Sequence, residues 1–428
     1  MLPPSRLGQD QASSRAVALT IIVLVFMVHA IDRGIVAVVL EPLRQEFGLD
    51  DAQAGIIGGL AYGVAYALAC IPMGIMVDRL NRRNLLGAIL ATWSAMTLLG
   101  GLAQSFAGLV ACRAAVGAAE SGGGPASVSL ISDMYRPDER ARAFGMLFLG
   151  GGLGAAIAAV VGGWIAREFD WRMALICAGI PGLFVAALLF ALVREPVRGA
   201  SEGVIVGRAP DAGTLARFFV RQQSMKWIYV AIPAVGIAMS VVATWTIPFL
   251  MRRHGLDIAM AGLMLGLLMG PAMGIGSVMT GQIADRLGKH SPRRRIAFSA
   301  VSLVLTLPAL WTAYTTDKLW LTVASLAAAQ MLFTSFLAPI IGVITMLCRP
   351  DMRGAALSAR DMLANFIGFG MGPFLAGVIS AAIGGEAALQ AAILITTIGG
   401  TVIGVGMLAL AARTIDADVA RANVAGIV

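Results

Sequence analysis

Four ionisable side chains lie within apolar segments of the first half of the chain. Two are in the segment 17–40 and two in the segment 106–131: Asp32, Arg33, Arg113 and Glu120. A charge inside a bilayer costs at least a few kcal/mol, so such groups usually face a cavity and are paired. A carboxylate beside an arginine stays ionised, whereas one that loses its partner in a dry pocket binds a proton. Asp32 and Glu120 are therefore candidate proton carriers.

The two arginines in these segments could have either of two roles. Arg113 and Arg33 can be counter-ions of the carboxylates, or they can anchor an anionic headgroup, because guanidinium binds carboxylate and phosphate bidentately. With a rise of about 1.5 Å per residue, Asp32 lies roughly 12 Å and Arg113 roughly 10 Å from the outer ends of their helices. Glu120 follows Arg113 by two turns on nearly the same face. The alternative is a static network that joins the two helices.

His29 precedes Asp32 by about one helical turn. Imidazole titrates near neutral pH when unperturbed, so His29 could relay or sense protons. A polar contact between packed helices is an equally good interpretation of this residue.

The composition points to a membrane protein. Hydrophobic residues make up 58% of the 428 residues and charged residues only 13%, against about a quarter charged in soluble domains. The net charge of +8 does not indicate nucleic-acid binding, because the basic residues lie between apolar runs. The four cysteines lack any ligand spacing, so we expect free thiols and no metal. Segment 16–30 is similar to a signal peptide, but the apolar pattern continues to Leu40 and predicts a retained helix.

The apolar runs predict an all-α membrane fold of twelve helices, near 17–40, 53–76, 84–103, 106–131, 141–166, 172–193, 226–250, 258–283, 294–314, 318–347, 354–382 and 386–412. The predicted parts are an N-terminal segment 1–16, a six-helix bundle 17–193, a central loop 194–225, a second bundle 226–412 and a tail 413–428. The two termini and every second loop, including loop 194–225, together hold roughly 23 basic residues, against roughly 6 in the remaining loops. Because basic residues collect on the cytoplasmic side, both termini and loop 194–225 are predicted to be cytoplasmic.

The two halves repeat each other. The sequence from Gly74 to Leu80 recurs from Gly281 to Leu287, so that Asp285 stands 207 residues after Asp78. Arg136-Pro137-Asp138 before the fifth helix recurs 213 residues later, before the eleventh. Similar offsets indicate a duplication, which is common in secondary transporters.

The first repeated loop reads GxxxDRxxRR and resembles the signature of the major facilitator superfamily. Further motifs resemble the spinster-like lipid transporters of that superfamily: Ile31-Asp32-Arg33, Leu40-Glu41-Pro42, Glu120 to Pro125 and Arg194-Glu195-Pro196. His29 departs from that group, where Asn is expected. The resemblance covers the whole chain and implies two pseudo-symmetric six-helix bundles around a central cavity, with the first and fourth helices on one side of it. It also implies a monomer.

Charged residues near the cytoplasmic ends predict a gate. Ion pairs among them could close the inner face, although some could simply be solvated topogenic arginines. The candidates are Asp78, Arg79, Arg82, Asp133, Arg142, Asp285 and Arg286.

The predicted helices also supply small residues for close helix contacts and a few side chains that could meet a ligand. Glycines cluster in the fifth and eleventh predicted helices, where the halves must move against each other. Candidate cavity residues, most of which could equally be packing residues, are Tyr62, Tyr66, Trp93, Trp245, Phe333, Arg360 and Asn365. Because the second half is nearly devoid of buried charge, one cavity wall is polar and the other apolar. Such a site suits an amphiphile.

These features predict a secondary transporter that works by alternating access and proton coupling. Its expected activity is export of an amphipathic or lipid-like molecule, such as a lysolipid or another lipid-like anion. The alternative is uptake of a small organic anion by proton symport. A membrane enzyme is not expected, since the helices hold no Ser/His/Asp set, and a non-transporting receptor is a remote alternative. The expected partners are the substrate, protons and membrane lipids. No cofactor is expected, because a proton gradient supplies the energy, and the expected location is a bacterial inner membrane.

Overall fold

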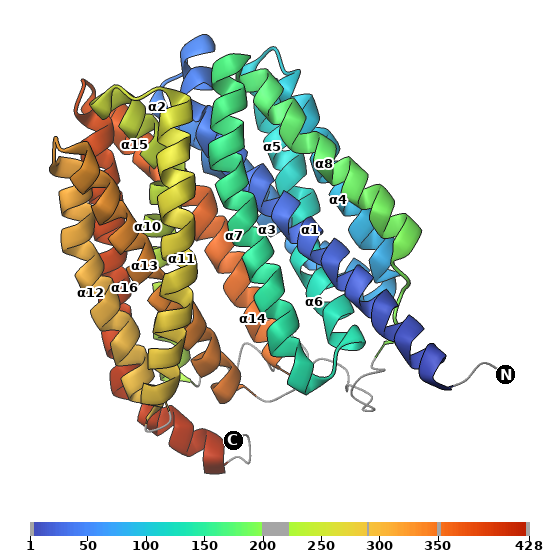
Figure 1. Ribbon diagram of the computed structural model, residues 1–428. Coiled ribbons are helices and arrows are strands. Elements are labelled where there is room, and N and C mark those ends of the chain that lie inside the picture. Colours follow the sequence, from blue (N-terminus) through green and yellow to red (C-terminus); the bar gives the residue numbers. More distant parts are fainter. Residues whose placement is uncertain (1–3, 199–221, 289–290, 349–351, 425–428) are drawn as a thin grey trace. The chain divides into compact units, whose positions relative to one another are not determined.

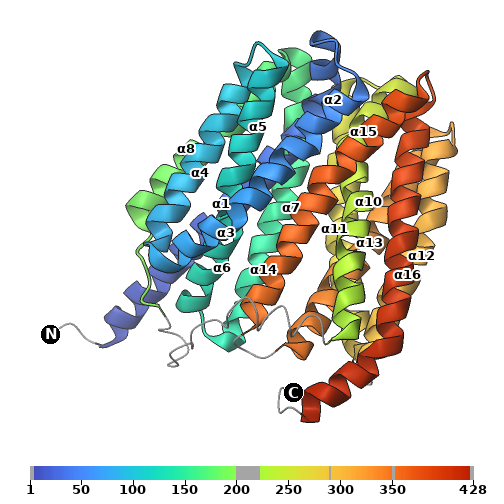
Figure 2. The same cartoon turned by 180° about the vertical axis from the view of Figure 1, so that it is seen from behind.

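A computed structural model describes residues 4–198, 222–288, 291–348 and 352–424 of the chain (Figure 1 and Figure 2). Within these ranges the structure is almost entirely helical and contains no strand. An all-α chain is what the sequence predicts. Most of the predicted central loop, residues 199–221, and the repeated landmark at 349–351 lie outside the described residues.

The chain forms two compact units. Unit 1 comprises Met1–Phe47, Val64–Ile205 and Asp257–Gly266. Its helices are α1 (Pro4–Glu46), most of α3 (Ala61–Arg79), α4 (Arg82–Gly101), α5 (Phe106–Glu120), α6 (Gly123–Met134), α7 (Pro137–Glu168), α8 (Trp171–Leu192) and the start of α11 (Ile258–Gly288).

Unit 2 comprises Gly48–Gly63, Val206–Leu256 and Leu267–Val428. It holds α2 (Asp51–Gly55), the π-helical turn η1 (Ile56–Leu60), α10 (Gln223–His254), the rest of α11, α12 (Pro292–Thr315), α13 (Leu319–Leu347), α14 (Arg353–Leu363), η2 (Ala364–Met371), α15 (Gly372–Ile383) and α16 (Ala388–Val424). Unit 2 includes residues 48–63, which lie within the predicted bundle 17–193, and unit 1 includes residues 257–266, which lie within the predicted bundle 226–412.

Eleven helices in the described part of the chain are long and apolar enough to cross a membrane. The predicted helix 106–131 is present as two pieces, α5 and α6, because the chain turns at Ser121–Gly122. Neither piece is long enough to span by itself. α1 begins before residue 17 and α16 ends after residue 412, since both continue through polar residues beyond the apolar run that marked them in the sequence.

The glycines of the fifth predicted helix allow α7 to approach α1 closely within unit 1. A Cβ atom at Gly150 would lie 2.7 Å from Cγ1 of Val23, and one at Gly34 would lie 2.8 Å from Cβ of Ala158. Distances this short exclude a side chain at either position without a shift of the backbone. The small residues therefore fix the contact between the helix that carries Asp32 and its neighbour.

The C-terminal end of α16 caps the first turn of α10 within unit 2. The buried Asp418 carboxylate accepts hydrogen bonds from the Ser224 N–H at 2.6 Å and from the Ser224 hydroxyl at 2.5 Å. The Gln223 N–H also donates to it at 3.4 Å. Free N–H groups at the start of a helix need such partners when they are buried. Residues 413–424, predicted as a tail, are therefore part of the fold.

Replacing Asp418 with Ala is expected to destabilise the protein, because it leaves buried donors of Ser224 without an acceptor. The loss of such a partner costs about 1–3 kcal/mol. The measurement is the thermal unfolding midpoint in detergent, which should fall by a few degrees in Asp418→Ala. Asp416 is an exposed carboxylate on the same helix, so Asp416→Ala is the matched control. An equal midpoint in both variants would contradict the capping role.

Candidate functional site

Three helices of unit 1 meet at Asp32. This carboxylate on α1 is buried, with 2% of its surface exposed, and Arg113 on α5 is also buried. Arg113 Nη1 lies 3.5 Å from Asp32 Oδ2, and the Thr97 hydroxyl on α4 donates a hydrogen bond to Oδ1. The structure therefore brings together the carboxylate and the arginine that the helical rise places at similar depths in their predicted helices. Thr97 is an additional contact that no sequence motif indicates.

A second acidic group lies beside the first. Glu120, the last residue of α5, is buried, and its Oε2 lies 3.3 Å from Nδ1 of His29 on α1. Glu120 and Asp32 also interact electrostatically. Arg33, the fourth predicted member, follows Asp32 on α1 and is half-buried. Two carboxylates, a guanidinium and an imidazole are thus held by two helices, an arrangement in which a proton or an anion can change the charge balance.

Trp93 is the predicted cavity residue that belongs to this cluster. Its ring centroid lies 6.1 Å from that of His29 in an edge-to-face arrangement, and the side chain is buried. Its Nε1 is buried without a hydrogen-bond partner among the described residues. Trp93 therefore packs against the imidazole and limits the positions that the ring can take.

Arg82 is the centre of a separate cluster at the other end of unit 1. It is 1% exposed and forms ion pairs with Asp133 of α6 and, at 2.8 Å, with Glu195 after α8. It also donates to Ser129 Oγ at 2.8 Å and to the Pro196 carbonyl at 3.0 Å. All three nitrogens of the Arg82 guanidinium therefore have acceptors. Glu195 was part of a family motif in the sequence, but its partner could not be read from that motif.

The other predicted gate residues do not join this cluster. Asp78, Arg79, Arg142 and Arg286 are exposed, and none of them forms an ion pair with another described residue. The Asp285 side chain lies outside the described residues. Of the predicted gate, the structure brings together Arg82 and Asp133 alone.

An additional ion pair joins the N-terminal part of α1 to the first turn of α7. Arg15 lies 2.7 Å from Glu139. A hydrogen bond from the Arg136 N–H, together with the Arg15 guanidinium, holds the pKa of Glu139 below its usual value. The carboxylate therefore stays ionised at neutral pH, as a helix N-terminus favours.

Most of the remaining predicted cavity residues have contacts that explain them as packing residues of unit 2. Tyr62 and Phe333 are buried in its core, and Trp245 donates to the Pro373 carbonyl at 3.0 Å. Arg360 pairs with its neighbour Asp361 at 2.9 Å, and the Asn365 amide donates to the Asp361 carbonyl at the same distance. Tyr66, on α3 in unit 1, is also buried.

Comparison with known proteins places these features in a family. The family model of the Major Facilitator Superfamily matches residues 22–359. An MFS-type efflux pump of Mycolicibacterium smegmatis is 28% identical over 87% of this chain and 86% of its own length. Protein spinster of Drosophila melanogaster is 26% identical over 89% of this chain, which spans 65% of that protein.

A solved structure shows the same fold. A bacterial homologue of the human lysosomal transporter Spinster, in an inward-facing and unoccupied conformation, matches with a TM-score of 0.84 and 25% identity. The match covers 95% of this chain and 98% of the other. The chain belongs to the Major Facilitator Superfamily. Within it, the similarities support the spinster-like group that the sequence motifs indicated, and the protein is an integral membrane transporter and not an enzyme.

Proposed function

We propose that this protein exports an amphipathic, anionic or zwitterionic molecule in exchange for protons. The observation that carries the proposal is the pair of buried carboxylates on α1 and α5, one beside Arg113 and the other beside His29. A transporter that moves no charge would have little reason to keep two such groups in the membrane, because each is costly to bury. The efflux activity named for the mycobacterial relative supports the direction.

The geometry suggests how a proton and a substrate could exclude each other, as exchange requires. Ionised Asp32 and Arg113, 3.5 Å apart, present a negative and a positive group side by side. The carboxylate can hold the cationic group of a zwitterionic headgroup while the guanidinium holds its acidic group, since guanidinium pairs well with carboxylate and phosphate. A proton on Asp32 removes the partner of the cationic group and releases the headgroup. Thr97 stays bonded to the carboxyl group throughout and keeps it in place.

His29 and Glu120 provide a second proton position one turn away. A proton shared between Nδ1 and Oε2 either neutralises the Glu120 carboxylate or converts His29 to an imidazolium paired with that carboxylate, without moving a helix. We propose that this pair passes protons to Asp32. The basic loops favour an orientation with both termini in the cytoplasm of a bacterial cell.

The test is proton flux in proteoliposomes that contain a pH-sensitive dye. Lysophospholipids and small organic anions are added separately, and each is followed by its own transport across the membrane. Proton movement that depends on a lysophospholipid supports the proposal. Substrate movement without proton movement would contradict the coupling and leave a facilitator.

The second candidate is uptake of a small organic anion by proton symport, which the adjacent Asp32 and Arg33 on α1 favour. Everted vesicles distinguish the two directions, since they accumulate the substrate of an exporter when energised. Accumulation of an organic anion in right-side-out vesicles alone would favour uptake.

A further inference from the structure

The break between α5 and α6 at Ser121–Gly122 is followed by two glycines in different surroundings. A Cβ atom at Gly123 would lie 3.2 Å from Cζ3 and 3.4 Å from Cη2 of Trp93 on α4. At the shorter distance the neighbour has to give by a few tenths of an ångström. A Cβ at Gly124 would meet no described atom within 4 Å outside its own stretch of helix. Gly123 therefore gives the Trp93 indole room that a side chain would take away.

Packing sets the position of this indole. Trp93 is 1% exposed, and its Nε1 has no hydrogen-bond partner in the described part of the chain. Its ring lies edge-to-face with the imidazole of His29, with the centroids 6.1 Å apart and the planes at 74°. Because no described hydrogen bond fixes the indole, a shift on its Gly123 side can pass to the imidazole.

The imidazole of His29 is held by rings and by a carboxylate. Phe26, one turn earlier on α1, lies 5.8 Å from it between ring centroids, and Phe26 itself packs edge-to-face on Phe148 of α7. Nδ1 of His29 faces Oε2 of Glu120 at 3.3 Å. With aromatic rings from α1 and α4 around it, the imidazole cannot follow a shift of the indole without changing its distance to Glu120.

The duplicated half has neither the break nor the indole. Asn81 and Ser291, 210 residues apart, are the N-caps of α4 and α12, and the residue 210 positions after Trp93 is Leu303. α13, the counterpart of the broken span, is continuous from Leu319 to Leu347. The helix packing of such a bundle therefore does not by itself require the break. The break occurs in the half that carries the proposed proton groups.

We propose that Gly123 and Trp93 are positioning residues for proton exchange between His29 and Glu120. The step is transfer of a proton from the imidazolium Nδ1 to the Glu120 carboxylate, which leaves a neutral imidazole and a carboxylic acid. It requires the two atoms to be within hydrogen-bond reach, and the indole keeps the ring turned toward Oε2. The inference rests on the proposed proton coupling. It concerns this chain in particular, because His29 stands where the spinster-like group is expected to have Asn.

The experiment compares Gly123→Ala with Gly124→Ala in proteoliposomes that contain a pH-sensitive dye, with a zwitterionic lysophospholipid as the probe. Gly123→Ala is expected to lower the maximal rate of proton flux by about fivefold, since a misplacement of roughly 1 Å can cost about a hundredfold. The lysophospholipid concentration at half-maximal rate should hardly change, because Asp32 and Arg113 are untouched. Gly124→Ala makes the same change of helix propensity without the contact and should behave as the wild type.

Two backgrounds separate positioning from a general loss of stability. In Trp93→Phe, which lacks the atoms that the Cβ would meet, adding Gly123→Ala should cause no further loss of rate or of thermal unfolding midpoint. In His29→Asn, adding Gly123→Ala should still lower the midpoint by a few degrees relative to Gly124→Ala, but it should not lower the rate further. A contact that acts only through the fold would lower both.

Equal flux in Gly123→Ala and Gly124→Ala would overturn the proposal, and so would a loss of rate that persists in His29→Asn. In either case a wild type that couples the lysophospholipid to protons would leave the proposed function standing. A wild type that moves the lysophospholipid without protons would contradict the proposed function, and with it the positioning role, while the midpoints would still report the contact between Gly123 and Trp93.

Discussion

In Asp32→Asn, substrate-driven proton movement is expected to fall by about tenfold or more, within the usual range of coupling between sites. Asn has the shape of the carboxyl group and can still accept the hydrogen bond from Thr97. It cannot gain or lose a proton, and it does not hold Arg113 by charge. The measurement is dye-reported proton flux in proteoliposomes on addition of the substrate that the wild type moves.

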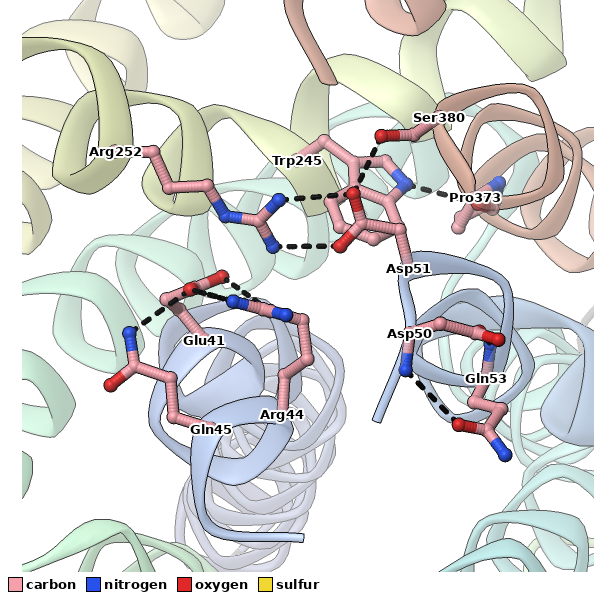
Figure 3. A network of polar contacts seen from close by, with 10 residues as sticks. All are labelled: Glu41, Arg44, Gln45, Asp50, Asp51, Gln53, Trp245, Arg252, Pro373 and Ser380. Atoms are coloured by element: carbon pink, nitrogen blue, oxygen red, sulfur yellow. Dashed lines mark hydrogen bonds and ion pairs between the residues drawn. The ribbon is translucent and has the colours of Figure 1, made fainter. Parts of the chain in front are cut away.

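Glu41 provides a matched control for this variant. It is a buried carboxylate on the same helix, α1, and accepts hydrogen bonds from Arg44 at 2.9 Å and from Gln45 at 3.1 Å (Figure 3). Glu41→Gln should therefore keep proton flux close to that of the wild type. Equal loss in both variants would show that buried charge on α1 serves folding instead of coupling.

Glu120→Gln tests whether the proton is carried mainly by the Glu120–His29 pair or by Asp32 alone. If the proton rests mainly between Glu120 and His29, this variant loses flux while Asp32→Asn retains some. If Asp32 alone carries the proton, Glu120→Gln slows the flux without abolishing it. Full coupled flux in both variants would reduce the two carboxylates to ties between α1 and α5 and contradict the proposal.

The sequence could predict the membrane spans from local periodicity, whereas the pairing of Asp32 with Arg113 also needed the family resemblance, which implies that the first and fourth helices lie on one side of the cavity. Apolar runs of one length indicate spans, and the helical rise places Asp32 and Arg113 at similar depth. The break of one span at Ser121–Gly122 was missed although three glycines and Pro125 stand there, residues that commonly interrupt a helix. The assignment of residues 48–63 to unit 2 and of residues 257–266 to unit 1 could not be predicted. Hydropathy does not say which neighbour a helix end contacts.

The clusters at the helix ends show a similar limit. Asp78 and Arg79 carry the family motif but are exposed, whereas their neighbour Arg82 is buried by partners from α6 and from the segment after α8. Which arginine turns inward depends on tertiary packing. Arg252 and Arg253 lie in the last turn of α10, at a helix end that the positive-inside rule assigns to the outer side. Basic residues are uncommon there, and both arginines have acidic partners, Asp51 and Asp317.

Arg82→Gln is expected to cause the largest loss of stability among single substitutions in unit 1. The wild-type guanidinium is almost fully buried and balances two carboxylates, Asp133 and Glu195. Gln leaves both acids without their cation and cannot reach all of the acceptors that a guanidinium fork serves. Removing one partner from a buried ion pair costs about 3–5 kcal/mol. The measurement is the thermal unfolding midpoint in detergent, together with the yield of monodisperse protein.

The same substitution at Arg79 tests whether this cost comes from the buried network. Arg79 is exposed and ends α3, three residues before Arg82 at the start of α4. Arg79→Gln therefore removes the same charge at nearly the same place and should leave the midpoint nearly unchanged. Arg82→Lys should give an intermediate result, because it keeps the charge but loses the bidentate geometry. If Arg79→Gln lowered the midpoint as much as Arg82→Gln, the loss would come from the charge of the loop, and Arg82 would not be the residue that holds α4, α6 and the segment after α8 together.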